Sequence, residues 1–210
     1  MGETESGVQT VYPLCSNGHS PVSVFCDQIT DGGGWTVIQR RADLPLREDF
    51  FRGWLDYQIG FGNLTGEFWL GLDNIHALVN ETHMELRVDL EDFDGEKRWA
   101  KYDLFHIEDS AGKYRLKLGD AGDALSIDSD QQFSTKDADH DSSSRLNCAE
   151  ECKGAWWYKD CSHSNLNGFQ HRGSYESSEF DFDGIFWYEF RGSDYSLKST
   201  QLSVRPRLEN

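Results

Sequence analysis

Alternating apolar and polar residues mark several strands in the first half of the chain. Met84 to Leu90 and Trp99 to Ile107 alternate clearly, and Tyr114 to Leu118 continues the pattern. Because successive side chains of a strand point to opposite faces, this pattern predicts neighbouring antiparallel strands with one buried face. Trp35 to Arg40 and Glu67 to Leu72 are predicted as strands from their β-branched and aromatic residues.

Short helices and turns are expected between these strands. Residues 8–26 suit short strands joined by turns. Residues 48–57 space their large apolar side chains at helical intervals, so a short amphipathic helix is expected there. A second helix is predicted over residues 73–79, with Asp73 or Asn74 as its N-cap.

From Gly119 onward the periodic pattern gives way to Gly, Asp, Ser and Asn with isolated aromatic residues. Regular structure is expected to be sparse there until Ile185 to Phe190 and Leu197 to Arg205. A loop-rich region of this length is usually functional when it is ordered, and its Trp and Cys content indicates order. We expect residues 1–5 to be a linker remnant and residues 6–207 to form one compact α+β domain.

Charge and motifs exclude several classes of function. The 210-residue chain has a formal net charge of −17 at pH 7. Such a field repels phosphate groups, and no Lys/Arg stripe offsets it, so nucleic acid is not an expected partner. No apolar run in the sequence approaches the roughly 20 residues of a membrane span, so membrane insertion is not expected. No nucleophile elbow, HExxH or P-loop motif is present, which favours a binding protein over an enzyme.

Cysteine usage points to disulfides rather than to zinc. The chain has five cysteines, whose spacing fits no zinc-finger pattern. We interpret Cys148–Cys161 as a disulfide that closes a short loop and contributes about 3 kcal/mol. Cys15–Cys26 forms a second bond in one interpretation. In another, Cys26 pairs with a cysteine upstream of the chain, which leaves Cys15 unexplained. Cys152 is left over, as a buried free thiol or as the site of an intermolecular bond.

An acidic loop carries the strongest sign of a ligand. Residues 133–148, here called the acidic loop, hold three aspartates at alternate positions and then three serines. This density of oxygen donors suits Ca²⁺, which takes six to eight oxygen ligands; a solvated acidic turn is the alternative. The predicted disulfide would hold the loop beside the aromatic segment 154–161. Together with glycosylation acceptor sequences at Asn63 and Asn80, this indicates a recognition site in a secreted domain.

A series of motifs then resembles one known family. In order they are CD at 26–27, GGGWTVIQRR at 32–41, GFG at 60–62, GEFWLG at 66–71, FST at 133–135, NC at 147–148, WW at 156–157, NLNG at 165–168, YSLK at 195–198 and RP at 205–206. They resemble the fibrinogen C-terminal domain, most of all the ficolin- and tachylectin-like lectins of invertebrates. The resemblance implies an α+β fold with a small N-terminal region, a central antiparallel sheet and a loop-rich C-terminal lobe that holds the ligand and calcium sites.

The family's metal ligands carry over onto the acidic loop. In resembling proteins two alternate aspartates and two backbone carbonyls hold calcium. Here these would be the side chains of Asp139 and Asp141 and the carbonyl oxygens of Ser143 and Arg145. The loop is one residue longer than in some relatives, so a shift of both carbonyls by one position is the alternative. The metal's role would be to fix the loop beside the ligand pocket.

The family's sugar pocket carries over less well. In the lectin members acetylated sugars lie beside the second cysteine of this disulfide, after a cis peptide that would here be Asp160–Cys161. The usual aromatic, His and Tyr-Ala positions fall at Cys152, at Ser162 with His163 displaced by one, and at Asp181-Phe182. Either nearby aromatic residues rebuild a pocket of different selectivity, or the acetyl site is lost. The expected ligand-binding residues are Cys152, Tyr158, Asp160, Cys161, Ser162, His163, Asp181 and Phe182.

Two functions follow from these expectations. The first is a secreted, calcium-dependent lectin of innate immunity that binds acetylated or other microbial glycans. The second is a protein-binding module of the angiopoietin, tenascin or fibrinogen type that has lost the acetyl pocket. The altered pocket favours the protein receptor, whereas the complete NLNG segment and the aromatic segment favour the carbohydrate, which we place first. In a full-length protein, homo-oligomers would raise avidity.

Overall fold

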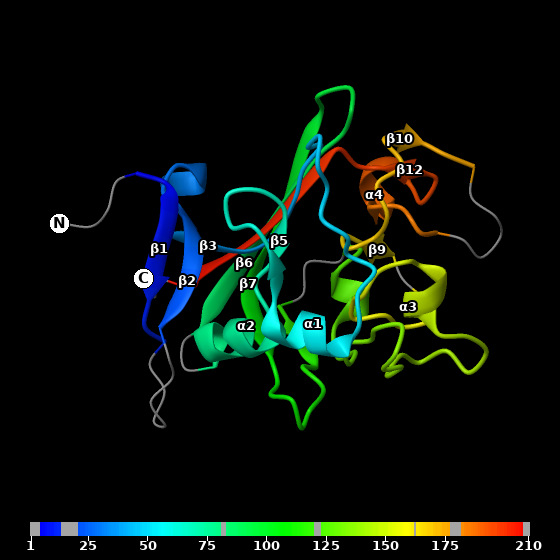
Figure 1. Ribbon diagram of the computed structural model, residues 1–210, viewed down its shortest axis with the longest axis horizontal. Helices are drawn as coiled ribbons and strands as arrows, with labels where there is room; N and C mark the ends of the chain where they lie inside the picture. The colour runs from blue at the N-terminus through cyan, green and yellow to red at the C-terminus, as the bar shows by residue number, and fades with distance from the viewer. Residues whose placement is uncertain are drawn as a thin grey trace.

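One antiparallel sheet organises the molecule (Figure 1). The computed structural model describes residues 5–13, 21–80, 83–119, 123–161, 163–176 and 182–207. Within these ranges nine strands form the sheet, in the order β1-β2-β3-β13-β6-β7-β8, with β5 beside β3 and β4 beside β5. They are β1 (Gly7–Val11), β2 (Val22–Asp27), β3 (Trp35–Arg41), β4 (Phe61–Gly62), β5 (Phe68–Trp69), β6 (Met84–Glu91), β7 (Lys97–Ile107), β8 (Leu116–Leu118) and β13 (Ser199–Pro206).

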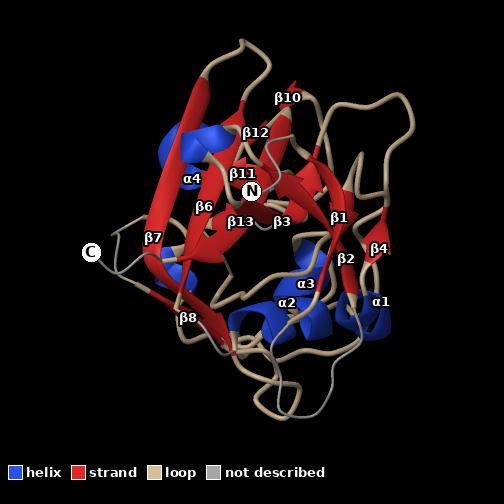
Figure 2. Ribbon diagram, turned by 90° about the vertical axis from the view of Figure 1, so that its left-hand side faces the viewer, coloured by secondary structure: helices blue, strands red, loops and turns tan. Residues whose placement is uncertain are grey.

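The alternating pattern places the sheet's core residues as predicted. In β6 every second side chain is buried, beginning with Met84 and ending with Leu90. The last strand, β13, lies in the middle of the sheet and pairs with both β3 and β6. Figure 2 shows β7, β6, β13 and β3 side by side, with α1 and α2 below them. The last strand is therefore inserted between strands from the first half of the chain, and the expected α+β fold with a central antiparallel sheet is confirmed.

Short helices and small two-stranded sheets make up the rest of the described fold. The C-terminal lobe, here residues 123–198, contains the strand pairs β9–β11 and β10–β12. The helices of the whole described fold are α1 (Trp54–Ile59), α2 (Leu72–Val79), α3 (Cys148–Glu151) and α4 (Tyr188–Arg191), and its 3-10 turns are η1 (Thr30–Gly32) and η2 (Ser126–Asp128). The strands of the lobe are β9 (Ser164–Asn165), β10 (Gly173–Ser174), β11 (Phe186–Trp187) and β12 (Tyr195–Ser196).

The helix predicted over residues 48–57 is wrong in its first half. The helix α1 begins only at Trp54. Upstream of it the backbone N–H groups are bonded outside any helix: that of Glu48 donates to Glu67 Oε2 (2.9 Å) and that of Phe51 to Asp49 Oδ1 (2.9 Å). These bonds, and that from the Arg52 N–H to the Phe50 carbonyl (2.9 Å), are turn contacts and not part of a helical ladder, so apolar spacing alone misled the prediction.

The second helix is confirmed, but its predicted cap is wrong. Gly71 precedes the helix α2, with a φ of 101° that favours glycine. Asp73 and Asn74 lie within the first turn. Their side chains bond elsewhere, since Asp73 accepts from the Tyr114 hydroxyl and Asn74 donates to the Leu70 carbonyl. Polar residues near a helix start thus served tertiary contacts instead of capping.

The four cysteines within the described ranges are one bonded pair and two free thiols. The Cys148–Cys161 disulfide is confirmed, with Cα atoms 5.4 Å apart. Cys26 carries a free thiol, so the predicted Cys15–Cys26 bond is not formed; Cys15 lies outside the described residues. Cys26 lies within β2, opposite Gly7 on one side and Thr36 on the other. Cys152 is a buried free thiol, which confirms the first of its two interpretations.

An aromatic core joins the sheet to the C-terminal lobe. The Phe133 ring lies 5.1 Å from that of Trp157, 5.4 Å from that of Tyr57 and 5.7 Å from that of Trp69, measured between centroids. All four side chains are buried. Two of them come from the sheet half and two from the lobe, so the loops of the lobe pack on a continuous core rather than on solvent.

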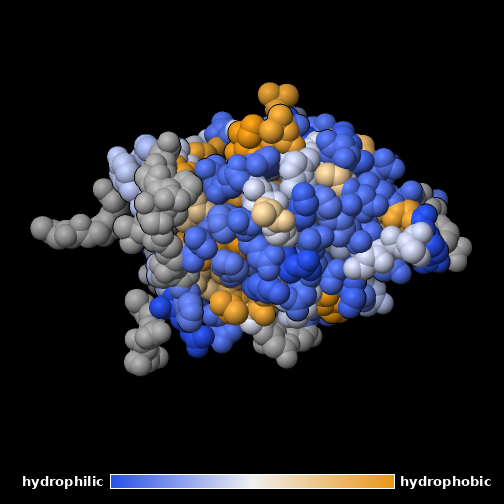
Figure 3. All heavy atoms as spheres, turned by 90° about the horizontal axis from the view of Figure 1, so that it is seen from below, coloured by the Kyte–Doolittle hydropathy of each residue, from blue (hydrophilic) through white to orange (hydrophobic). Residues whose placement is uncertain are grey.

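The face of the molecule shown in Figure 3 is largely polar. Seen from below, hydrophilic residues dominate, and apolar residues form small separate patches (Figure 3). Within the described part of the chain, no helix has the length and apolar character that a membrane crossing requires.

Candidate functional site

The acidic loop is tied to the sheet half through Asp137. Its Oδ1 accepts hydrogen bonds from the backbone N–H of Trp54 (2.8 Å) and from the Thr135 hydroxyl (2.7 Å). A Cβ atom at Gly53 would lie 2.6 Å from Asp137 Oδ2, so glycine allows this close approach. Asp137 therefore fixes the loop against the start of α1, while the two following aspartates remain as the predicted metal ligands.

Asp139 and Asp141 form a crowded pair of carboxylates. The backbone N–H of Asp141 donates to Asp139 Oδ1 (3.2 Å). The Asp141 carboxylate accepts from the backbone N–H groups of Ser143 and Cys148, both at 2.8 Å. Burial, the largest cause, and the negative charge of Asp139 raise the pKa of Asp141 from 3.8 to about 6. A nearby cation would relieve both effects.

The donor set of the loop fits Ca²⁺. Ser143 Oγ is buried without a hydrogen-bond partner among the described residues, in the same loop as the two carboxylates. Two carboxylates, backbone carbonyls and water suit a hard cation that prefers oxygen. No group of three or more His, Cys, Asp or Glu side chains in the described ranges could hold a metal. A site here would thus depend on the carbonyl oxygens of Ser143 and Arg145 as well as on Asp139 and Asp141.

Helix α3 connects this loop to the disulfide. Asn147 is its N-cap, and its Oδ1 accepts from the backbone N–H groups of Ala149 (2.9 Å) and Glu150 (3.3 Å). The Asn147 amide also donates to the Thr135 carbonyl (3.3 Å). The cap therefore sets the position of Cys148, the first residue of the helix, relative to the acidic loop.

A cavity of about 190 Å³ lies beside the disulfide. Its apolar wall includes Leu146, Phe182 and Phe186, and the Phe182 and Phe186 ring centroids are 6.5 Å apart. Arg145 and Asp160 supply opposite charges that lie 3.9 Å apart and are largely exposed. We call it the disulfide cavity; its lining residues are Arg145, Leu146, Cys152, Asp160, Cys161, Phe182 and Phe186.

The structure brings four of the eight predicted ligand-binding residues to this cavity. They are Cys152, Asp160, Cys161 and Phe182, and the Asp160–Cys161 peptide is cis, as the resemblance implied. Burial raises the pKa of the Cys152 thiol, which keeps the thiol protonated and apolar in character. Ser162 and Asp181, two more of the predicted residues, lie outside the described residues.

The other two predicted residues lie elsewhere. Tyr158 is fully buried, and its hydroxyl donates to Asn165 Oδ1 (2.8 Å), so it supports the lobe from within. The His163 ring packs against that of Tyr188, with centroids 5.8 Å apart, and is absent from the cavity wall.

Sequence reasoning missed Leu146 and Phe186, although both are apolar neighbours of predicted features. Their convergence depends on the fold, since 40 positions separate them (186 − 146).

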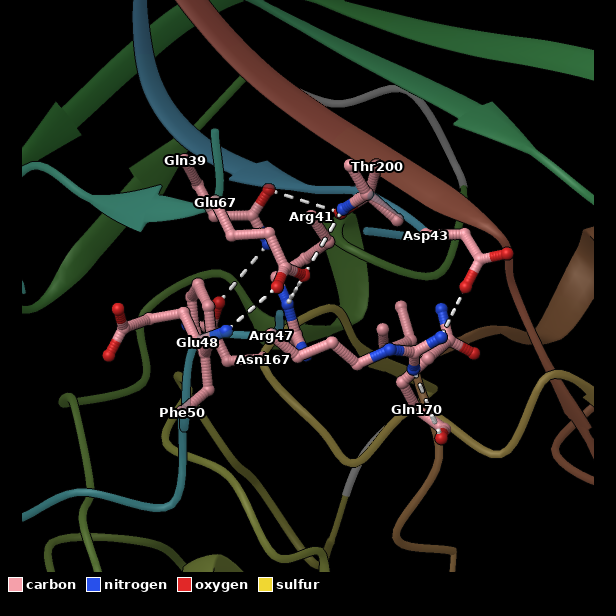
Figure 4. A network of polar contacts seen from close by, with 12 residues as sticks. Gln39, Arg41, Asp43, Arg47, Glu48, Phe50, Glu67, Asn167, Gln170 and Thr200 are labelled. Carbon is pink, nitrogen blue, oxygen red and sulfur yellow. Dashed lines mark hydrogen bonds and ion pairs between the residues drawn. The ribbon is translucent and has the colours of Figure 1, made fainter. Parts of the chain in front are cut away.

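A buried polar network joins β3 to the lobe (Figure 4). Arg41 Nε lies 3.3 Å from Glu67 Oε1, and the two side chains are 4% and 2% exposed. Arg41 Nη1 donates to the carbonyls of Leu166 (3.2 Å) and Gly168 (2.8 Å). The NLNG segment noted in the sequence is therefore held by an arginine of the sheet.

Comparisons with known proteins agree with this architecture. A family model described as "Fibrinogen beta and gamma chains, C-terminal globular domain" matches residues 1–207. Fibrinogen C domain-containing protein 1 of Xenopus tropicalis is 46% identical over 99% of this chain and 46% of its own length. Human tenascin-R is 46% identical over 98% of this chain and 15% of its own length. The chain thus spans less than half of either relative.

Solved structures give the same picture. The fibrinogen-like globe domain of human ANGPTL6 matches with a TM-score of 0.90 and 46% identity, covering 99% of this chain and 92% of that one. A lamprey fibrin D-dimer, complexed with the peptide ligand Gly-His-Arg-Pro-amide, matches with a TM-score of 0.87 and 34% identity, covering 100% of this chain and 72% of that one. These relatives do not support the narrower resemblance to ficolins and tachylectins.

Proposed function

Because the protein belongs to the family of C-terminal globular domains found in the β and γ subunits of fibrinogen, we propose that it is a secreted recognition module whose ligand site is the disulfide cavity. The family is one of non-enzymatic recognition and adhesion proteins. The proposed ligand is an acetylated glycan, such as those of microbial surfaces, which would give the domain a role in innate immunity.

The disulfide cavity is the observation that carries this proposal. Its apolar wall of Leu146, Phe182 and Phe186 suits the methyl group of an acetyl substituent. At its edge the exposed charges of Arg145 and Asp160 can donate to and accept from the carbonyl, N–H and hydroxyl groups of a sugar. A small apolar pocket with a few polar groups at its edge is the usual form of a site for a small substituent.

Arg145 connects the proposed calcium site with the disulfide cavity. Its carbonyl oxygen is a proposed metal ligand, together with that of Ser143 and the carboxylates of Asp139 and Asp141. The Arg145 side chain also lines the disulfide cavity. Ca²⁺ bound there would supply positive charge and fix the backbone from which this side chain extends, so metal removal would loosen the cavity.

Peptide recognition is the second candidate. The lamprey fibrin relative is complexed with Gly-His-Arg-Pro-amide, a cationic peptide. The Asp160 carboxylate at the cavity edge is 52% exposed and is available to such a cation. The departures from the acetyl-binding pattern at Cys152, Ser162 and Asp181-Phe182 also favour a ligand other than an acetyl sugar.

A glycan array, probed with calcium and again with a chelator, tests the proposal. Wild-type protein should bind N-acetylated glycans in calcium only, and Phe182→Ala should weaken binding about tenfold because it removes one aromatic wall. Leu46→Ala is the matched control, since Leu46 is 90% exposed and is not among the residues that line the cavity. Binding of Gly-His-Arg-Pro-amide with no glycan bound in either condition would replace the lectin by the peptide-binding module.

A further inference from the structure

A second cavity, of about 360 Å³, lies on the sheet side of the lobe and shares no lining residue with the disulfide cavity. We call it the Arg41 cavity. Its aromatic lining is Phe50, Phe51 and Phe169, and its basic lining is Arg41, Arg47 and Lys153. The residues come from the end of β3, the segment before α1, and the loops that follow Cys152 and Asn167.

Arg41 brings a buried cation with unused donors to this cavity. The residue is 3% exposed, and its guanidinium lies 3.9 Å from the centroid of the Phe50 ring. Its Nε bonds to Glu67 and its Nη1 to the carbonyls of Leu166 and Gly168. Its Nη2 makes no hydrogen bond to any residue within the described ranges. The N–H groups of Nη2 can therefore donate charge-assisted hydrogen bonds to an acceptor ligand in the cavity.

Lys153 brings a second cation that is not neutralised. Its ammonium group donates to the Glu150 carbonyl (2.8 Å) and lies 5.4 Å from the centroid of the Phe51 ring. No described carboxylate lies within ion-pair distance of it, although the chain has 37 acidic and 20 basic residues. By contrast, Arg47 at the same cavity pairs with Asp43. The uncompensated positive charge at this cavity therefore belongs to Lys153.

Two carboxylates line the Arg41 cavity, and they repel an anionic ligand to different degrees. Glu48 pairs with Arg52, which neutralises its charge. Asp49 is exposed; its Oδ1 accepts only a backbone N–H bond, from Phe51, and it has no cationic partner among the described side chains. Asp49 is thus a repulsive group whose removal should strengthen the binding of an anion.

We propose that the Arg41 cavity binds a hexuronate residue of an acidic glycan. The carboxylate of the sugar accepts charge-assisted hydrogen bonds from Arg41 Nη2 and Lys153 Nζ. The C–H face of the pyranose ring packs against the aromatic lining, in which Phe169 is 59% exposed and free to contact a ligand. The net charge of −17 opposes a polyanionic chain, so the ligand is a terminal hexuronate rather than a continuous polyanion. The inference depends on neither calcium nor the disulfide cavity.

Titration of the whole chain with methyl β-D-glucuronide, followed by NMR, tests this proposal. Its neutral match, methyl β-D-glucoside, should bind at least about tenfold more weakly, because it lacks the carboxylate. Lys153→Gln should weaken glucuronide binding about tenfold, and Asp49→Asn should strengthen it about threefold. Lys97→Gln on β7 makes the same change of net charge outside this cavity and should alter neither affinity.

Several outcomes would overturn the proposal. They are equal binding of glucuronide and glucoside, unchanged glucuronide binding by Lys153→Gln, or no glucuronide binding at all. Lys153-dependent binding of a short peptide with a free C-terminal carboxylate, without glucuronide binding, would assign the cavity to peptides instead. Thermal unfolding of each variant confirms that it is folded. Binding of N-acetylated glycans should not change in Lys153→Gln, which separates this inference from the proposed function.

Discussion

The sheet and the C-terminal lobe are stabilised by different kinds of hydrogen bond. In the sheet, backbone groups bond to backbone groups along continuous ladders, such as the eight residue pairs that join β13 to β6. In the lobe, buried amide side chains bond to backbone carbonyls. The Asn165 amide donates to the Cys152 (2.8 Å) and Gly184 (3.1 Å) carbonyls, and the Asn167 amide donates to the Ala155 carbonyl (3.0 Å).

This difference explains where recognition sites arise. A ladder accepts any side chain that suits its face, but its shape varies little. A loop held by particular side chains can take an irregular shape, at the cost of depending on each of those residues. The disulfide cavity is built from the lobe's loops, and these loops also supply four of the ten residues that line the Arg41 cavity; both cavities lie next to the buried polar residues or the disulfide that fix those loops. Substitutions should therefore separate the two regions.

The largest effect is expected at the junction of the two regions. Glu67→Ala should lower the free energy of unfolding by about 4 kcal/mol, because it leaves Arg41 as an unpaired buried cation. It also removes the acceptor of the Ala42 and Glu48 N–H groups. Urea denaturation, followed by circular dichroism and by Trp fluorescence, measures the change. A loss below about 1 kcal/mol would contradict the importance of this ion pair.

The disulfide should affect the lobe more than the sheet. Replacing both Cys148 and Cys161 by Ala should cost about 3 kcal/mol, because it frees a loop of sequence separation 13 in the unfolded state. Hydrogen exchange should become faster in residues 148–161, while the amides of β6 and β13 keep their protection. Cys26→Ala, which removes a free thiol, should change the stability by less than about 0.5 kcal/mol. Equal loss of protection in both regions would argue against the separation drawn above.

Calcium binding should depend on pH through Asp141. With its pKa raised to about 6, protonation competes with the metal below that pH. The affinity for Ca²⁺ should therefore be about tenfold lower at pH 5 than at pH 7.5, by calorimetric titration. Since the folded pKa exceeds the ordinary value of 3.8, this group's stabilising effect is complete below pH 3.8 and is lost as the pH rises through about 6.

The metal-free domain should accordingly be less stable at pH 7 than at pH 5 as far as Asp141 is concerned, and added Ca²⁺ should reverse that order. Asp141→Asn is the control, because it should bind Ca²⁺ weakly at both pH values. An affinity that does not change with pH would show that Asp141 is not a ligand.

The smallest effect is expected on the exposed surface of the sheet. Lys101 pairs with Asp31 (3.1 Å) and Glu85 (3.3 Å), yet its side chain is 32% exposed. Lys101→Gln should lower the stability by less than about 1 kcal/mol, and less again at high salt, because water and ions screen such pairs. Thermal unfolding at low and high salt checks this. A larger loss would mean that the sheet, like the lobe, depends on individual polar contacts.

The sequence predicted the sheet better than the lobe for a physical reason. The alternation in 84–90 and 99–107 is local, and it identified β6 and β7 to within two residues. The helix predicted over 48–57 begins only at Trp54, and the segment before it is held by contacts with residues distant in sequence, such as that of the Glu48 N–H with Glu67. The family resemblance located the disulfide cavity, but four of the eight predicted residues reached its described wall. The burial of Tyr158 could not be inferred, because nothing local distinguishes a core tyrosine from one that binds a ligand.

Local patterns in the chain were enough to predict the long strands β6 and β7, the family, the spacing of Asp139 and Asp141, and the Cys148–Cys161 pair, because each is encoded within a short segment or a linear series of motifs. Which polar groups are buried, and which partners they bond to, became visible only in the folded structure. Arg41 and Glu67 lie 26 positions apart, and Leu146 and Phe186 lie 40 apart (186 − 146), yet each pair shares one environment. Contacts between residues so far apart in the chain depend on long-range packing, which local sequence patterns do not predict.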